Sequence, residues 1–85
     1  MDLFRVHPAG HVESLVDLDS AGGGRLDPDT VMGPGSWRAA RLAAGAGLVA
    51  IEGLRNGDAE VAFCAVRPPG HHATPTRTMG FCLLN

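Results

Sequence analysis

The sequence predicts an α/β domain, because a helix-forming segment leads into a continuous apolar run. The helix is expected from Trp37 to about Leu54, and the apolar run covers Val61–Val66. The 12 glycines and 6 prolines among 85 residues are typical of short elements divided by turns. Apolar residues make up 45% of the chain, which excludes a disordered charged tail.

A first helix is expected from about Pro8 to Asp17. Proline suits the first helical turn, because its missing N–H would have no partner there. An imperfect apolar stripe supports the helix, made by Val12, Leu15, Val16 and Leu18. The glycines at 22–24 end it, and the following stretch, 25–35, has the composition of a loop.

Ser36 is expected to cap the second helix, because its hydroxyl can accept a hydrogen bond from a free N–H of the first turn. Apolar residues recur there at spacings of three or four: Trp37, Ala40, Ala44, Leu48, Ile51 and Leu54. Gly45 and Gly47, with the alanines beside them, give a smooth face on which another backbone could pack. Asn56-Gly57 supplies a left-handed stop.

The apolar run Val61–Val66 is expected to form a strand buried on both faces, as in a parallel sheet under helices. Such a strand cannot satisfy its own backbone groups, so its neighbours are expected outside this sequence. We therefore interpret residues 1–85 as a partial domain, truncated at both ends. The alternative is a small α+β domain that dimerises to complete its sheet.

Charge and composition exclude several classes of protein. The sequence contains seven arginines, no lysine and nine acidic residues, so its net charge is close to neutral. The arginines are scattered along the sequence, which disfavours nucleic-acid binding. No run of about 18 apolar residues is present to span a membrane. No secretory signal is visible, and two cysteines fit a reducing compartment, so we expect a cytoplasmic protein.

The residues best suited to catalysis cluster in the segment RPPGHHA, residues 67–73, directly after the expected strand. Open α/β sheets bind ligands outside the carboxyl ends of their strands. The Pro-Pro-Gly sequence fixes the backbone there, so His71 and His72 are expected to be held in place. One imidazole can act as a general acid or base while the other supplies charge or orientation. Two histidines alone would be incidental; the flanking RPPG and the position favour function.

Other histidines leave an alternative open. His7 and His11 are four residues apart, so both could lie on one helix face and bind a metal. Together with His71 and His72 they could form a free-standing metal-binding domain. We expect instead that one lies at the helix cap and the other on the helix surface.

Five further residues have simpler interpretations. Asp27 and Asp29 flank a proline, a pattern more typical of a turn than of paired catalytic carboxylates. Cys64 lies in the expected strand and is predicted to be inert core, whereas Cys82 is expected close to the site. Arg67 could pair with a carboxylate behind the loop.

The RPPGHHA motif is followed by GFCLLN at 80–85, with a seven-residue spacer between His72 and Gly80, and this combination resembles the histone deacetylase superfamily. That group includes acetoin-utilisation deacetylases and acetylpolyamine amidohydrolases. Earlier segments are also similar: Gly22–Asp27, Asp29-Thr30, Gly35–Ala40 and Ala43–Ala46. The resemblance covers essentially the whole chain and a minor part of a family domain. It implies a three-layer arginase/deacetylase-type domain with a parallel sheet, of which two helices and one or two strands are present.

The resemblance implies a zinc-dependent deacetylase in which an activated water attacks the amide of an acetylated lysine or polyamine. It implies that His72 is the general base, which takes the water proton and passes it to the leaving amine. His71 would stabilise charge and bind the water. Gly80 and Phe81 would line the narrow tunnel that holds the acyl chain.

The resemblance also implies what this sequence lacks. The family's zinc ligands, two Asp and one His, belong to other segments of the domain. The carboxylates that partner the two histidines also belong to other segments. The same holds for the Tyr that stabilises the oxyanion, since this sequence has no Tyr. We therefore expect Zn²⁺ only in the complete domain, no metal ligand in this chain, and no activity for the chain alone.

The implied partners are an acetyl-lysine or acetylpolyamine substrate and the remainder of the domain. Near the site rim, Asp27, Asp29 and Ser36 would touch substrate. The alternative function is a non-catalytic binding module that retains the scaffold.

Overall fold

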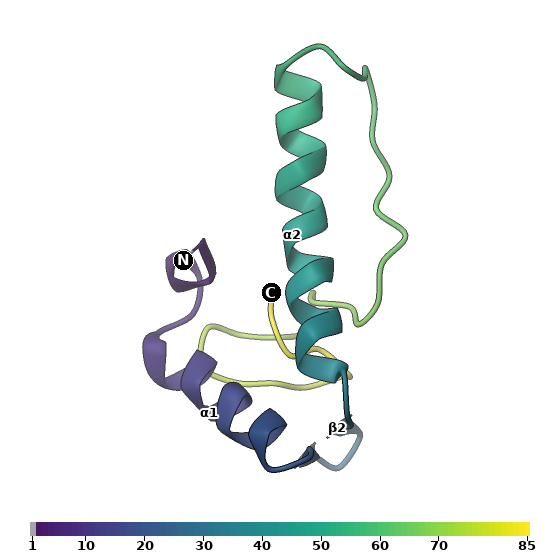
Figure 1. The fold of residues 1–85 in the computed structure, drawn as a ribbon. Helices are drawn as coiled ribbons and strands as arrows, with labels where there is room; N and C mark the ends of the chain where they lie inside the picture. Colours follow the sequence, from purple (N-terminus) through teal and green to yellow (C-terminus); the bar gives the residue numbers. More distant parts are fainter. Residues whose placement is uncertain (1) are drawn as a thin grey trace.

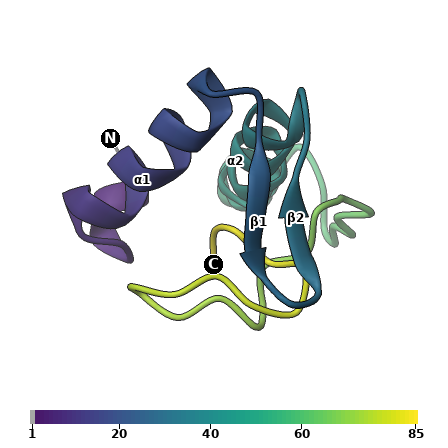
Figure 2. The same cartoon turned by 90° about the horizontal axis from the view of Figure 1, so that it is seen from below.

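The computed structural model describes residues 2–85, in which a small hairpin joins two helices (Figure 1). The second helix is long and stands upright from the rest, and the hairpin lies below its first turn (Figures 1 and 2). The elements in order are η1 (Asp2–Arg5), α1 (Ala9–Ser20), β1 (Gly24–Asp27), β2 (Thr30–Met32) and α2 (Ser36–Arg55). No helix within residues 2–85 is both long and apolar enough to cross a membrane.

Helix α1 confirms the first predicted helix and ends at Ser20 rather than Asp17. Pro8 occupies the N-cap position with extended backbone. At the other end the amide of Gly22 bonds to the carbonyl of Asp19 and that of Gly23 to the carbonyl of Leu18. Gly22 has a φ of 94°, the left-handed conformation that this type of helix end requires. The glycine run therefore ends the helix as expected.

The stretch that was expected to be a loop, 25–35, contains most of an antiparallel hairpin, so that prediction is wrong for residues 25–27 and 30–32. Strand β1 pairs with β2, with Gly24 opposite Met32 and Asp27 opposite Thr30. Two strands of four and three residues are too short to show a clear alternating pattern in the sequence. The Asp-Pro-Asp segment forms the turn between them, as predicted.

Helix α2 confirms the second predicted helix, but Ser36 is not its cap. Gly35 occupies the N-cap position with a φ of 86°, and the Ser36 hydroxyl accepts a hydrogen bond from the Gly33 amide at 2.9 Å. A glycine reaches this left-handed backbone more easily than serine does. At the far end Gly57, with a φ of 80°, terminates the helix as predicted.

The apolar face predicted for α2 is buried only at its start. Trp37 and Ala40 are buried, whereas Leu48, Ile51 and Leu54 are exposed. A Cβ added at Gly45 or Gly47 would meet no atom of residues 2–85 within 4 Å, so nothing in these residues packs on the two glycines of the expected smooth face. The core of this structure therefore lies at one end of α2.

The prediction of a buried strand at 61–66 is wrong for this structure. The chain leaves the end of α2 and returns along it in extended form, without a strand partner among residues 2–85 (Figure 1). Val61 is 84% exposed, Phe63 is 92% exposed, and Cys64 is exposed rather than part of a core. An apolar run becomes a buried strand only where neighbouring strands supply its hydrogen bonds.

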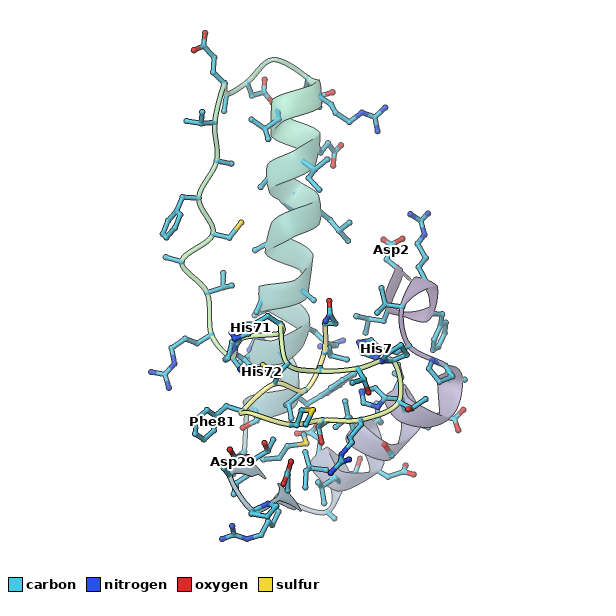
Figure 3. The ribbon with its side chains drawn as sticks, turned by 180° about the vertical axis from the view of Figure 1, so that it is seen from behind. Asp2, His7, Asp29, His71, His72 and Phe81 are labelled. Atoms are coloured by element: carbon cyan, nitrogen blue, oxygen red, sulfur yellow. The ribbon has the colours of Figure 1, made fainter. Side chains whose placement is uncertain are left out.

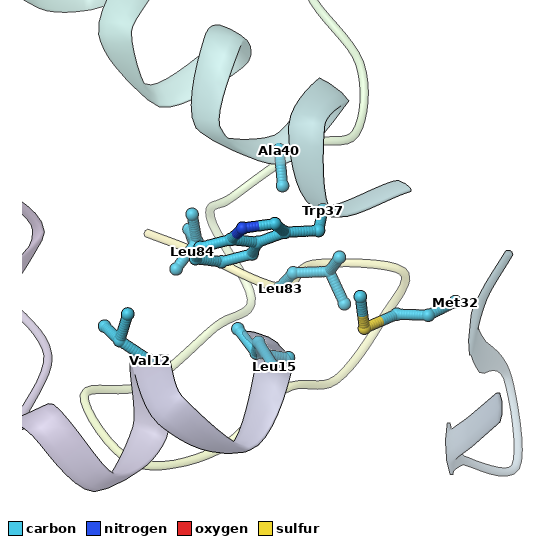
Figure 4. Packing of buried hydrophobic residues seen from close by; sticks show 7 residues of the cluster. All are labelled: Val12, Leu15, Met32, Trp37, Ala40, Leu83 and Leu84. Carbon is cyan, nitrogen blue, oxygen red and sulfur yellow. The ribbon is translucent and has the colours of Figure 1, made fainter. Parts of the chain in front are cut away.

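The hydrophobic core forms where α1, the hairpin and the start of α2 meet the C-terminal segment (Figure 4). Leu83 and Leu84, the two leucines of the GFCLLN motif, lie between α1 and the first turns of α2 in this view (Figure 4). The buried members are Val12, Leu15, Met32, Trp37, Ala40, Leu83 and Leu84. The core therefore anchors the end of the motif that was predicted to border the active site.

Candidate active site

The two predicted catalytic histidines lie side by side at the surface (Figure 3). The ring centroids of His71 and His72 are 4.3 Å apart, and the ring planes are tilted by 52°. Both follow Gly70, and the amide of Ala73 closes the turn by bonding to the Gly70 carbonyl at 3.1 Å. The pair is therefore presented to solvent by a tight turn, with each ring in a different orientation.

Gly70 explains how this turn reaches the C-terminal segment. A Cβ at this position would lie 2.5 Å from the Leu84 carbonyl oxygen and 3.3 Å from the Asn85 Cα. Only glycine allows the two backbones to approach this closely. The Asn85 side chain then donates a hydrogen bond to the Ala73 carbonyl at 2.8 Å, so both ends of the histidine turn are fixed to the GFCLLN motif.

The predicted tunnel residues Gly80 and Phe81 form a two-residue turn against His72. Met79 and Cys82 exchange two backbone hydrogen bonds, of 3.2 and 2.9 Å, around the turn. Gly80 has a φ of 56° and Phe81 a φ of 68°, the conformation of a type I′ turn. A Cβ at Gly80 would lie 2.6 Å from the His72 Cδ2 atom. The structure therefore brings the two motifs together, with the Phe81 side chain 63% exposed beside them.

Cys82 links the same two motifs on their buried side. Its side chain is fully buried, and the residue lies close to the site, as expected. The amide of His72 donates to the Cys82 Sγ at 3.4 Å, and the thiol donates to the Gly80 carbonyl at 3.5 Å. These are weak hydrogen bonds of the kind that thiols make, and they join the histidine turn to the Gly80 turn without exposing the sulfur.

His7 and His11 are structural residues, and the expectation that they lie at a cap and on the surface is wrong. His7 is 1% and His11 8% exposed, and their rings stack with centroids 4.5 Å apart. His7 donates from Nδ1 to the Pro75 carbonyl at 2.8 Å and accepts at Nε2 from the Asn85 amide at 2.9 Å. His11 donates from Nε2 to the Leu83 carbonyl at 3.0 Å. The pair ties the N-terminal segment to the site loop.

The structure does not support the metal-binding alternative. Both ring nitrogens of His7 already form hydrogen bonds with protein groups. His7 and His11 are buried, whereas His71 and His72 are exposed at the surface. Within residues 2–85, no group of three or more His, Cys, Asp or Glu side chains gathers to hold a metal ion. A catalytic zinc takes three protein ligands and an open position, so the residues described here do not form such a site.

The hairpin turn borders the site. Asp27 and Asp29 share a hollow of about 480 Å³ with His72 and Gly80. Ser36 lies in a smaller neighbouring hollow with Phe81 and Arg67. Within residues 2–85 no ion pair of Arg67 is present, so its expected carboxylate partner is not among them.

One residue at the site was missed from the sequence. Thr30 is 1% exposed, and its Oγ1 accepts a hydrogen bond from the Phe81 amide at 3.0 Å. The same hydroxyl donates to the Asp29 Oδ1 at 3.2 Å. The only signal was its place in the Asp29-Thr30 pair, which carries no chemical hint that the hydroxyl reaches a residue 51 positions later.

Comparison with known proteins places these features in context. A sequence profile described as the Histone deacetylase domain matches residues 1–85. The Histone deacetylase-like amidohydrolase of Pseudomonas aeruginosa is 48% identical over 81 residues, which cover 95% of this chain and 21% of that protein. A Probable deacetylase of Methanothermobacter thermautotrophicus is 48% identical over 85 residues, which cover 99% of this chain and 25% of that protein.

A solved structure is similar to nearly the whole chain. The crystal structure of the HDA15 HD domain matches with a TM-score of 0.91 at 38% identity and covers 98% of this chain. The match covers 24% of that domain's chain, so this chain spans about a quarter of its length. The superposition confirms the predicted fold class, because the two helices and two strands are arranged as in part of that domain.

Proposed function

Because the chain belongs to the histone deacetylase family, we propose that it supplies the tandem-histidine part of a zinc-dependent deacetylase acting on N-acetylated lysine or polyamine amides. One observation carries the proposal. His71 and His72 lie 4.3 Å apart, and the Gly80–Phe81 turn packs directly against His72. A proton-transferring pair is thus combined with an exposed aromatic ring suited to an aliphatic chain.

His72 is the proposed general base and acid. In amide hydrolysis the water oxygen bonds to the acetyl carbon, and the bond between that carbon and the amine nitrogen breaks. The His72 imidazole takes a proton from the attacking water and returns one to the departing amine, which leaves acetate and a free amine. Its exposed ring can reach solvent, while contact with Gly80 fixes its position.

His71 is proposed to stabilise charge beside this proton transfer. Its ring is tilted by 52° relative to that of His72, so the two imidazoles direct their nitrogens differently. The split of roles is carried over from the family, in which carboxylates from other segments partner the two histidines.

The substrate is proposed to lie over the turn that contains Phe81. Phe81 is 63% exposed, so its ring can contact the methylenes of a lysine or polyamine. Asp27 and Asp29 line the adjacent hollow with His72. Their carboxylates can accept hydrogen bonds from a peptide N–H or from the ammonium groups of a polyamine.

Zinc belongs to the proposed complete domain. Family membership implies the metal, but the side chains of residues 2–85 do not gather into a ligand set that fits it. We propose that the ligands come from outside these residues. The 85-residue chain alone is therefore expected to bind no catalytic zinc and to hydrolyse no acetylated amine.

Hydrolysis assays on two polypeptides test the proposal. The 85-residue chain and the full-length polypeptide that carries it are each given an acetyl-lysine peptide and an acetylpolyamine, with and without a zinc chelator. We expect chelator-sensitive hydrolysis by the full-length polypeptide alone, and the ratio of kcat/KM for the two substrates identifies the preferred class. Binding of the acetylated amine without any hydrolysis would support the non-catalytic alternative instead.

A further inference from the structure

Phe81 has a backbone conformation that aromatic residues rarely adopt. Its φ of 68° makes it the one non-glycine residue with positive φ in the part of the chain that is described. It occupies the second central position of a type I′ turn, where glycine is strongly preferred. Such strain persists only where the surrounding structure enforces it, and it concentrates at functional sites.

Thr30 makes the contact that enforces this conformation. The Phe81 amide donates to the Thr30 Oγ1 at 3.0 Å, and the hydroxyl in turn donates to the Asp29 Oδ1 at 3.2 Å. The two hydrogen bonds form a chain that ends on a carboxylate, so each strengthens the other. Thr30 is 1% exposed, and pairing with Asp27 fixes its backbone in the hairpin.

Other contacts in the turn do not replace this one. The backbone bonds between Met79 and Cys82 close the turn, and the Cys82 thiol bonds to the Gly80 carbonyl. None of these reaches the Phe81 amide. The hydrogen bond from the Phe81 amide to Thr30 is therefore the link that sets Phe81 relative to the hairpin, across 51 positions of the sequence.

We propose that Thr30 is a positioning residue for catalysis: it holds Phe81 in the left-handed conformation in which its ring forms one wall of the acyl-chain tunnel. This inference rests on the proposed function. Asp29 contributes by orienting the Thr30 hydroxyl, so that its oxygen lone pair faces the Phe81 amide. In this proposal Phe81 contacts the substrate, and Thr30 does not.

Threonine substitutions in the full-length polypeptide test the positioning directly. Thr30→Val keeps the shape and removes the hydroxyl, Thr30→Ser keeps the hydroxyl, and Thr76→Val is the control at an exposed position in the site loop. Amide hydrogen exchange measured by NMR is expected to speed up at Phe81 in Thr30→Val, while the Cys82 amide stays protected. KM for an acetyl-lysine peptide should rise by about three- to tenfold, the range for one neutral hydrogen bond, with kcat changed less. Thr30→Ser and Thr76→Val should match the unmodified protein.

A double-substitution cycle separates positioning from general stability. In a Phe81→Gly background the aromatic wall is already gone, so adding Thr30→Val should leave KM unchanged. An equal rise of KM in both backgrounds would overturn the proposal, as would unchanged Phe81 exchange in Thr30→Val.

If Thr30→Val does not fold, Thr30→Cys takes its place, because a thiol is a weak acceptor of similar size. Absence of hydrolysis by the unmodified protein would refute the proposed function, whereas the exchange measurement judges the Thr30 contact independently.

Discussion

Gly80 lies directly against the imidazole of His72, with no room between them for a side chain. A Cβ at position 80 would approach the His72 ring to 2.6 Å at Cδ2 and 2.9 Å at Cγ. Real Cβ atoms do not approach so closely, and the backbone of Gly80 is also left-handed, with a φ of 56°. The small residue therefore determines where the proposed base can lie.

Replacing Gly80 with alanine should impair catalysis through His72. The new methyl group must push the imidazole aside or distort the turn, so kcat of the full-length polypeptide should fall by about 100-fold, the loss that misplacement of a reacting group by about 1 Å can cause. NMR of the histidine side chains should show a shifted His72 ring signal. Gly47→Ala is the matched control, because its Cβ meets no atom of residues 2–85 within 4 Å. Equal activity of the two variants would contradict this view of the site.

Replacing His7 with leucine should destabilise the site loop. The change leaves the Pro75 carbonyl and the Asn85 amide without their partner, at 2.8 and 2.9 Å respectively. Each hydrogen bond contributes about 0.5–1.5 kcal/mol net, so loss of both should lower the free energy of unfolding by about 1–3 kcal/mol. Urea denaturation measures the loss, and Glu13→Gln, at an exposed position of α1, is the control. A change of less than 0.5 kcal/mol for His7→Leu, about the scatter of surface substitutions, would show that these hydrogen bonds add nothing.

The exposed apolar segment around Phe63 should make the 85-residue chain associate. Phe63 is 92% and Val61 84% exposed, and the extended backbone has no strand partner within residues 2–85. Unpaired, apolar extended segments pair readily with other chains. Phe63→Lys should shift the chain toward monomer in sedimentation experiments. Glu60→Lys adds the same side chain without removing apolar surface and should change association less. A monomeric unmodified chain with a sharp two-state thermal transition would refute this prediction.

Local signals explain why the helices and their ends could be predicted. Gly22 and Gly57 stop α1 and α2 in the left-handed conformation, with φ values of 94° and 80°. Helical periodicity and turn residues act over a few positions, and a single sequence contains them in full. Ser36 misled because a serine before an apolar run is a common cap, while its hydroxyl here bonds back to Gly33.

Long-range contacts explain what could not be predicted. The apolar run at 61–66 has the composition of a buried strand, but strand formation depends on neighbours that residues 2–85 do not supply. The burial of His7 depends on Pro75 and Asn85, and the role of Thr30 depends on Phe81. The motif pattern identified His71, His72, Gly80 and Phe81 as a group, and the structure brings them together.

Hydrolysis by a His72→Gln variant of the full-length polypeptide tests the central claim most directly. Loss of a general acid–base typically costs about 10²- to 10⁴-fold, so kcat on an acetyl-lysine peptide should fall by that factor while KM changes little. Arg77→Gln, at an exposed position of the same loop, should retain the unmodified kcat. If His72→Gln keeps kcat within about threefold of the unmodified protein, well below that range, His72 does not transfer the proton and the proposed function is wrong.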